Sequence, residues 1–116
     1  MGQYKDDNLI VKLSFEFALE IIKYSEVLEE RRKYNMSNQM WRSGTSVGTM
    51  VNEVLNAGSK VDFIHKMKIA GKESDETEYW LNLCKLSELY PKCDSLLENG
   101  VVINKIINKI FSSSKQ

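Results

Sequence analysis

The stretch from Asp62 to Cys84 carries one uninterrupted stripe of apolar and small residues at heptad spacing. In alternating steps of four and three, the stripe contains Phe63, Met67, Ala70, Ser74, Thr77, Leu81 and Cys84. Residues at this spacing lie on one face of an α-helix. Small side chains in the middle of the stripe would let a second helix approach closely. The pattern is typical of a helix inside a bundle.

The rest of the sequence also favours long helices. Its 116 residues contain only one proline and six glycines, so few segments are interrupted. Apolar residues make up 42% and charged residues 28%, which indicates a globular rather than a disordered chain. We expect a single all-α domain over residues 1–116, folded as an antiparallel up-down-up-down four-helix bundle, because short connections return each helix alongside the last.

The expected helices cover residues 8–31, 37–57, 60–90 and 94–112. Asn8, and either Ser37 or Asn38, are the predicted N-caps of the first two helices. Ser59, followed by Asp62 three residues later, resembles a capping box at the start of the third.

Three breaks in the pattern bear on where the helices end. Gly58-Ser59 is expected to end the second helix and Pro91 the third. Asn99-Gly100 either breaks the last helix or is tolerated within it at a cost of about 1 kcal/mol, and we favour a continuous helix. Gly44 and Gly48, one turn apart, indicate close approach to a neighbouring helix.

The first helix carries two apolar stripes where a small bundle needs one. The first stripe contains Ile10, Leu13, Phe17, Ile21, Tyr24 and Leu28, and the second contains Val11, Phe15, Ala18, Ile22 and Ser25. The surplus indicates that this helix is buried on two sides, either by its neighbours in the bundle or by another subunit.

Charge and hydropathy narrow the classes of partner. The 16 basic and 16 acidic residues cancel, so any nucleic-acid site must be a local patch. No apolar run reaches the roughly 18 residues of a membrane span, and the first eight residues lack the apolar core of a signal peptide. We expect a cytoplasmic protein with no membrane partner. Cys84 and Cys93 match no zinc or redox spacing and are expected to be free thiols.

Residues of the second and third helices also resemble a known family. The matching residues are Gln39-Met40-Trp41-Arg42-Ser43-Gly44, Ser46-Val47, Asn52-Glu53, Ser59 and the run DFIHKMKIAGKESDETEYWL. The most specific are Asn52-Glu53, Asp62-Phe63, Lys72-Glu73, Glu76 and Tyr79-Trp80-Leu81. From Phe15 to Leu89 the chain resembles the bacterial 23S ribosomal RNA intervening-sequence protein family.

The resemblance implies an antiparallel four-helix bundle that assembles into a homopentameric ring. One branch of the family, the accessory variability determinant of diversity-generating retroelements, binds nucleic acid and a reverse transcriptase. At the position of Trp41 the family commonly has a basic residue, and its nucleic-acid-binding members are strongly cationic. We expect a non-enzymatic binding scaffold without a cofactor, whose partner is RNA, DNA or a ribonucleoprotein. The alternative is a protein-only module, such as a reverse-transcriptase accessory protein.

Basic residues of the second and third helices are the candidate nucleic-acid contacts. Arg42, Lys66, Lys68 and Lys72 are expected to contribute most, and a ring would repeat their weak attraction. The competing interpretation is a solvated face of Lys-Glu pairs.

Aromatic and aliphatic residues are the candidate oligomer contacts. Tyr79 and Trp80 precede Leu81, so at least one of them should project sideways from the core. Aromatic side chains are enriched at subunit interfaces. We predict an interface formed by Phe15, Ile22, Tyr79 and Trp80.

The remaining polar residues predict structural roles and no metal site. The acidic residues are Glu73, Asp75, Glu76 and Glu78, and a di-iron site would need histidines on two helices, whereas His65 is the only one. Glu73 and Glu76 are expected to pair with Lys72 or with basic residues of another helix or subunit. Asn52-Glu53 is expected to be a buried, hydrogen-bonded pair, and His65 to lie at the surface or an interface.

Overall fold

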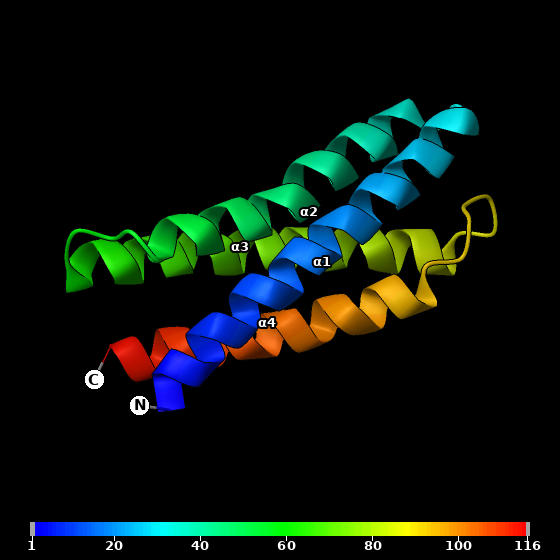
Figure 1. Cartoon of the computed structure of the whole chain (residues 1–116). Coiled ribbons are helices and arrows are strands. Elements are labelled where there is room, and N and C mark those ends of the chain that lie inside the picture. Colours follow the sequence, from blue (N-terminus) through cyan, green and yellow to red (C-terminus); the bar gives the residue numbers. More distant parts are fainter. Residues whose placement is uncertain (1, 116) are drawn as a thin grey trace.

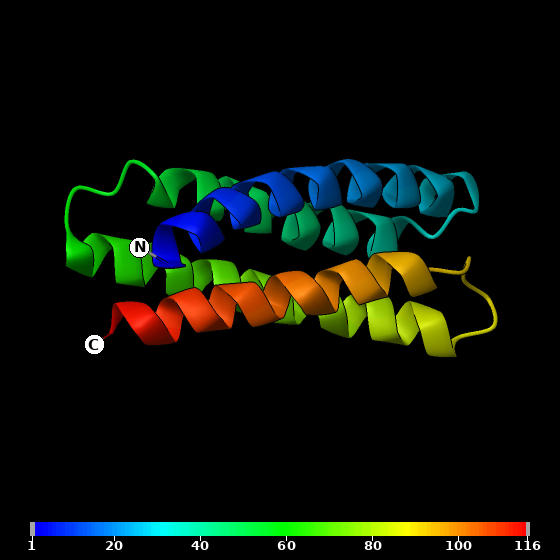
Figure 2. The same ribbon diagram turned by 60° about the horizontal axis from the view of Figure 1, so that its bottom comes forward.

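The computed structural model describes residues 2–115, with side chains from Asn8 onward. Its elements are α1 (Gly2–Glu30), α2 (Tyr34–Val54), α3 (Lys60–Leu86) and α4 (Asp94–Ser114). The helices run up and down in turn and form an elongated bundle of 44 × 21 × 18 Å (Figure 1). Each helix packs on the next along the chain, and α4 packs back on α1 (Figure 2). The predicted fold class is confirmed.

The core follows the predicted stripes. On α3, every member of the heptad stripe from Met67 to Cys84 is buried, and Phe63 is half-buried at the open end. On α1, the first stripe is buried except for the half-buried Leu13. The second stripe is different, because Phe15 is 66% exposed and only Ser25 is buried. The apolar surplus of α1 is therefore covered only in part by this bundle.

The glycines of α2 lie where the backbones come close, as predicted. A Cβ on Gly44 would lie 2.6 Å from Ile21 Cγ1, and one on Gly48 would lie 3.2 Å from the carbonyl oxygen of Ser14. Gly100 on α4 is buried against the ring of Phe17. The preference for a continuous last helix is confirmed, because α4 runs through Asn99-Gly100 without a break.

Several predicted helix ends were wrong. Helix α1 begins at Gly2, before the expected cap Asn8, and α4 continues to Ser114, beyond the predicted end at residue 112. Helix α2 begins at Tyr34, so Ser37 lies inside it and donates a hydrogen bond of 2.8 Å to the Ser25 carbonyl oxygen. A buried hydroxyl used in this way serves packing between helices.

The third helix begins as predicted but ends early. The Ser59 hydroxyl accepts a hydrogen bond from the Asp62 N–H at 3.1 Å, and the Gly58 N–H donates to Asp62 Oδ2 at 3.2 Å. Together with Lys66, the Gly58 N–H holds the pKa of Asp62 below its usual range. Helix α2 ends at Val54, three residues before the predicted end at residue 57, and α3 ends at Leu86, four residues before the predicted end at residue 90.

The turn between α1 and α2 places a non-glycine residue in the left-handed region. Arg32 has a φ of 61°, and its N–H donates to the Glu29 carbonyl while the Lys33 N–H donates to the Leu28 carbonyl. This pair of bonds is the Schellman pattern, in which glycine usually takes the position of Arg32. The turn satisfies the last carbonyl groups of α1 and starts α2 almost at once.

Candidate functional site

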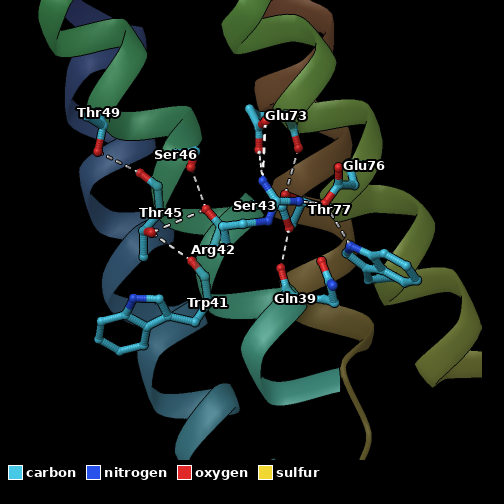
Figure 3. A network of polar contacts seen from close by, with 11 residues as sticks. Gln39, Trp41, Arg42, Ser43, Thr45, Ser46, Thr49, Glu73, Glu76 and Thr77 are labelled. Atoms are coloured by element: carbon cyan, nitrogen blue, oxygen red, sulfur yellow. Dashed lines mark hydrogen bonds and ion pairs between the residues drawn. The ribbon is translucent and has the colours of Figure 1, made fainter. Parts of the chain in front are cut away.

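The polar contacts between α2 and α3 centre on Arg42. Its guanidinium lies 3.1 Å from Glu73 Oε2 and also pairs with Glu76, and the Trp80 indole N–H donates to Glu76 at 3.1 Å. Figure 3 shows Arg42 pointing toward α3, whereas Trp41 points to the opposite side of α2, over α1. The prediction that Glu73 and Glu76 pair with a basic residue of another helix is confirmed. Arg42 is thus neutralised by two carboxylates.

The other three predicted nucleic-acid contacts lie on the first half of α3. Lys66 pairs with Asp62 at 3.2 Å, one turn earlier on the same helix. Lys68 and Lys72 are exposed, and among residues 8–115 no carboxylate pairs with either. Two of the four predicted residues are therefore engaged within the chain and two are available to a ligand. Their role in binding stays a prediction.

The fold adds basic residues from α4 to Lys68 and Lys72. Asn104 donates hydrogen bonds to Ser74 Oγ at 3.0 Å and to Asp75 Oδ1 at 2.8 Å, which fixes the antiparallel register of α3 and α4. In this register the end of α4 runs beside the start of α3 (Figure 2). We define the lysine patch as Lys68, Lys72, Lys105 and Lys109, all of them exposed.

The lysine patch belongs to a larger separation of charge. Residues 60–72 and 105–115 carry seven lysines and one carboxylate, a net charge of +6. Residues 73–104, the other half of the same helix pair, carry two lysines and seven carboxylates, a net charge of −5. Each half lies at one end of the α3–α4 pair, so this helix pair has one strongly basic end in a chain with no net charge. Such a local field attracts polyanions that the net charge does not.

Sequence reasoning missed Lys105 and Lys109. The two lysines stand one helical turn apart in the second half of α4, as Lys68 and Lys72 do in the first half of α3. An antiparallel pairing of these two helices brings such pairs together. A comparison of the lysine spacing in the two helices could therefore have identified Lys105 and Lys109 from the sequence.

A second feature is an elongated groove between α1 and α2. It has a volume of about 750 Å³, and its lining residues include Val11, Phe15, Ala18, Ile22, Trp41 and Gly48. A smaller hollow of about 270 Å³ continues it along the same helices, lined by Ser25, Glu26, Glu29, Ser37, Asn38 and again Trp41. We refer to both together as the α1–α2 groove.

The groove contains residues for which burial was predicted. Asn52 and Glu53 are both exposed and line the groove, so the prediction of a buried, hydrogen-bonded pair was wrong. They fall on the side of α2 that turns away from the core stripe through Val47, Val51 and Val54. The predicted interface residues Phe15 and Ile22 lie in the same groove.

The other two predicted interface residues lie on α3. Tyr79 is 59% exposed, while Trp80 is half-buried and packs edge-on against it, with ring centroids 5.3 Å apart. The prediction that one of the two projects sideways is confirmed. Within the described part of the chain, α1 and α3 have no close backbone contact, so these residues lie on a different face from Phe15 and Ile22. Their role in assembly stays a prediction.

The titratable groups of the core are protected from water. Cys84 and Cys93 are free, as predicted, and buried. Burial raises the pKa of the Cys84 thiol to about 11 and raises that of Cys93 as well. The Tyr24 hydroxyl lies between α1 and the loop before α4 and donates a hydrogen bond of 2.7 Å to the Pro91 carbonyl. Burial raises its pKa too. The Tyr24 hydrogen bond ties α1 to the loop between α3 and α4.

Two further surveys cover the described residues. No three side chains of the His, Cys, Asp and Glu types come together there in a geometry that could hold a metal ion. None of the helices between residues 2 and 115 combines the length and the apolar character needed to cross a membrane. His65 is exposed, in agreement with its predicted surface position.

Comparison with known proteins places the chain in a family. The model of the 23S rRNA-intervening sequence protein family matches residues 6–109. The chain is also similar to a crystal structure of a protein of unknown function from the S23 ribosomal protein family of Bacteroides thetaiotaomicron. The two are 38% identical over 92% of this chain and 98% of the other, with a TM-score of 0.85. No curated protein matches the sequence. The chain therefore belongs to the 23S rRNA-intervening sequence protein family.

Proposed function

We propose that this protein is a non-enzymatic, homo-oligomeric scaffold that binds the phosphate backbone of nucleic acid through the lysine patch. The observation that carries the proposal is the separation of charge along α3 and α4, in which residues 60–72 and 105–115 carry a net charge of +6. Lysine side chains contact phosphates without reading base sequence. Binding is therefore expected to weaken steeply with salt and to depend little on sequence.

Assembly strengthens the proposed binding. Four lysines on one chain offer few phosphate contacts, so a single patch binds weakly. When several copies are joined, each patch after the first meets its ligand at a high effective concentration. The family resemblance implies five copies, and the proposal adopts that number. The exposed Phe15 and Tyr79 side chains supply apolar surface for contacts between copies.

The test is a charge reversal with a control of equal net charge. The patch variant is Lys68→Glu, Lys72→Glu and Lys105→Glu, and the control is Lys23→Glu, Arg31→Glu and Arg32→Glu. Fluorescence anisotropy with a labelled RNA measures affinity across a salt series. The patch variant is expected to bind at least about tenfold more weakly than the control. The magnitude of its slope of log affinity against log salt should be smaller than that of the wild type by about three.

Two results would contradict the proposal. An equal loss in both variants would show that affinity follows the net charge and not the patch. A wild-type protein without measurable affinity for RNA or DNA at low salt would exclude nucleic acid as a ligand.

The second candidate function is a protein-only interaction module, such as an accessory protein of a reverse transcriptase. The α1–α2 groove favours it, because an apolar groove with exposed aromatic side chains is typical of a protein interface. This candidate predicts that purified protein binds a partner protein while its absorbance spectrum shows no bound nucleic acid.

A further inference from the structure

The lysine patch contains an amide side chain that the proposed function does not yet use. Asn108 is exposed on α4, between Lys105 and Lys109 in the sequence. Gly71 lies opposite it on α3, beside Lys72, because a Cβ on Gly71 would lie 3.9 Å from Asn108 Oδ1. An uncharged polar group therefore lies among lysines of both helices, where α3 and α4 meet.

Hydrogen bonds within the bundle fix the orientation of this amide. The Asp75 carboxylate can only accept, so it is the amide nitrogen of Asn104 that donates to it, at 2.8 Å. The amide oxygen of Asn104 then accepts a hydrogen bond of 2.9 Å from Asn108 Nδ2. Asn108 Oδ1 is left on the side of Gly71, and no hydrogen bond from residues 8–115 reaches it. The free atom of this amide is an acceptor.

Gly71 leaves that acceptor open to a ligand. Glycine has no side chain, so the backbone of α3 is bare beside Asn108 and a ligand can approach it closely. The nearest atoms to a Cβ at this position would be Ile107 Cγ2 at 3.6 Å and Asn108 Oδ1 itself. A larger residue at position 71 would cover the oxygen.

The donors and acceptors of the patch match the backbone of RNA better than that of DNA. Lysine ammonium groups donate to phosphate oxygens, which both nucleic acids carry. Asn108 Oδ1 needs a donor, and the deoxyribose and phosphate groups within a DNA strand have no N–H or O–H. Every RNA nucleotide has one in its ribose 2′-hydroxyl, the group by which a protein distinguishes RNA from DNA. One acceptor among several cations therefore suits a ribose between phosphates.

We propose that Asn108 Oδ1 accepts a hydrogen bond from a ribose 2′-hydroxyl, and that the lysine patch for this reason prefers RNA to DNA. The sugar lies over Gly71, and the phosphates on either side of it lie against the lysines of α3 and α4. Asp75 ends the site one helical turn beyond Gly71, because its carboxylate repels a phosphate. This inference rests on the proposed function and names the class of nucleic acid that the patch binds.

The ratio of two affinities isolates the amide oxygen. Asn108 Nδ2 has a second hydrogen, which can donate to a phosphate of RNA or of DNA alike. Removing the side chain can therefore weaken the binding of both nucleic acids. Only the contact with the 2′-hydroxyl changes the affinity for RNA relative to that for DNA.

The experiment compares three ligands of one base sequence, each of about eight nucleotides. They are oligouridine RNA, the corresponding oligodeoxyuridine, and 2′-fluoro RNA, which keeps the sugar conformation of RNA but has no hydroxyl to donate. Fluorescence anisotropy on the full chain at low salt should show RNA binding about three- to tenfold more tightly than either other ligand, as expected for one hydrogen bond.

Two variants assign the preference to a residue. Asn108→Ala should bring the three affinities together, and the exposed position should tolerate the change. The control is Asn82→Ala, which removes an exposed amide from the acidic half of α3, where Asn82 donates to the Glu78 carbonyl. It should keep the wild-type ratio of RNA to DNA affinity.

The outcomes separate this inference from the proposed function. Equal affinity of the wild type for RNA and DNA would overturn the inference and leave the lysine patch as a site for phosphate alone. Binding of 2′-fluoro RNA as tightly as RNA would assign the preference to sugar conformation instead. A preference that survives in Asn108→Ala, or is lost in Asn82→Ala, would remove Asn108 as its source. Failure of all three ligands to bind would refute the proposed function itself, and this inference with it.

Discussion

Gly44 on α2 and Gly71 on α3 show how much one methyl group can matter. A Cβ on Gly44 would lie within 2.8 Å of three side-chain atoms of Ile21, which is fully buried. A Cβ on Gly71 would meet Ile107 Cγ2 at an ordinary 3.6 Å. The first glycine is required by the close approach of α1 and α2, and the second is not.

Gly44→Ala is expected to lower the free energy of unfolding by about 1–3 kcal/mol, because the core must move to admit the methyl group. Gly71→Ala is the matched control, and it is expected to raise that free energy by up to about 1 kcal/mol through higher helix propensity. Urea denaturation measures both changes. Equal stabilities of the two variants would contradict the close packing at Gly44.

Arg32→Gly is expected to stabilise the protein by about 1 kcal/mol, because glycine adopts the left-handed conformation without the steric cost that Arg32 bears. Its neighbour Arg31 does not have a positive φ, so Arg31→Gly should lower the stability. The loss should be smaller than the gain expected from Arg32→Gly. Thermal unfolding compares the two variants. Destabilisation by Arg32→Gly would mean that the arginine side chain contributes more than its backbone costs.

The buried thiols predict a loss of stability at high pH. Burial raises the pKa of Cys84 from its ordinary value of 9.0 to about 11, so the folded chain keeps a proton that the unfolded chain loses. This contribution is fully present below pH 9 and is lost as the pH rises through 11; it amounts to about 3 kcal/mol. Urea denaturation from pH 8 to 11 should show the decline. The decline should be smaller in Cys84→Ala, and an unchanged slope would exclude Cys84 as its source.

At the scale of the helix, buried faces were predictable and helix ends were not. The heptad stripe from Met67 to Cys84 is buried as predicted, because a helix inside a bundle must bury the face that its periodicity defines. Pro91 marks the latest point at which α3 could end, yet the helix stops at Leu86 and residues 87–90 form a turn. Ser37 has the chemistry of a cap, but its hydroxyl bonds to α1 instead.

The start of α3 is the one helix end that sequence predicted in detail. Ser59→Ala is expected to lower the free energy of unfolding by about 1 kcal/mol, because the Asp62 N–H loses its acceptor. Ser113→Ala, at an exposed site near the end of α4, is the control and should change stability little. A Ser59→Ala variant as stable as this control would show that the cap contributes nothing.

At the scale of the whole molecule, the sequence predicted a bundle and a local basic patch but not where that patch lies. The position of Lys105 and Lys109 beside the first half of α3 depends on the register that Asn104 sets with Ser74 and Asp75. No periodicity within one helix contains that information. The groove was foreseen more fully, because the second stripe of α1 already indicated a face in need of a partner.

Assembly should matter for long ligands and not for short ones. An RNA of about eight nucleotides fits a single site, so Phe15→Glu, which places a charge in the apolar surface proposed for contacts between copies, should bind it as tightly per chain as the wild type does. An RNA long enough to reach several patches should bind the wild type about a hundredfold more tightly than the variant. Anisotropy titrations with both lengths give the two ratios. If the ratio of wild-type to variant affinity were the same for both RNA lengths, assembly would not contribute to binding.

The basic and acidic halves of the α3–α4 pair give this side of the neutral chain an electric dipole. A distant polyanion first rotates such a molecule, because the molecule has no net charge to be attracted. The attraction that follows falls off faster with distance than that of a cationic protein, and salt screens it beyond about 10 Å at 0.1 M. The protein is therefore expected to ignore distant nucleic acid and to rotate its basic end forward only once it is close.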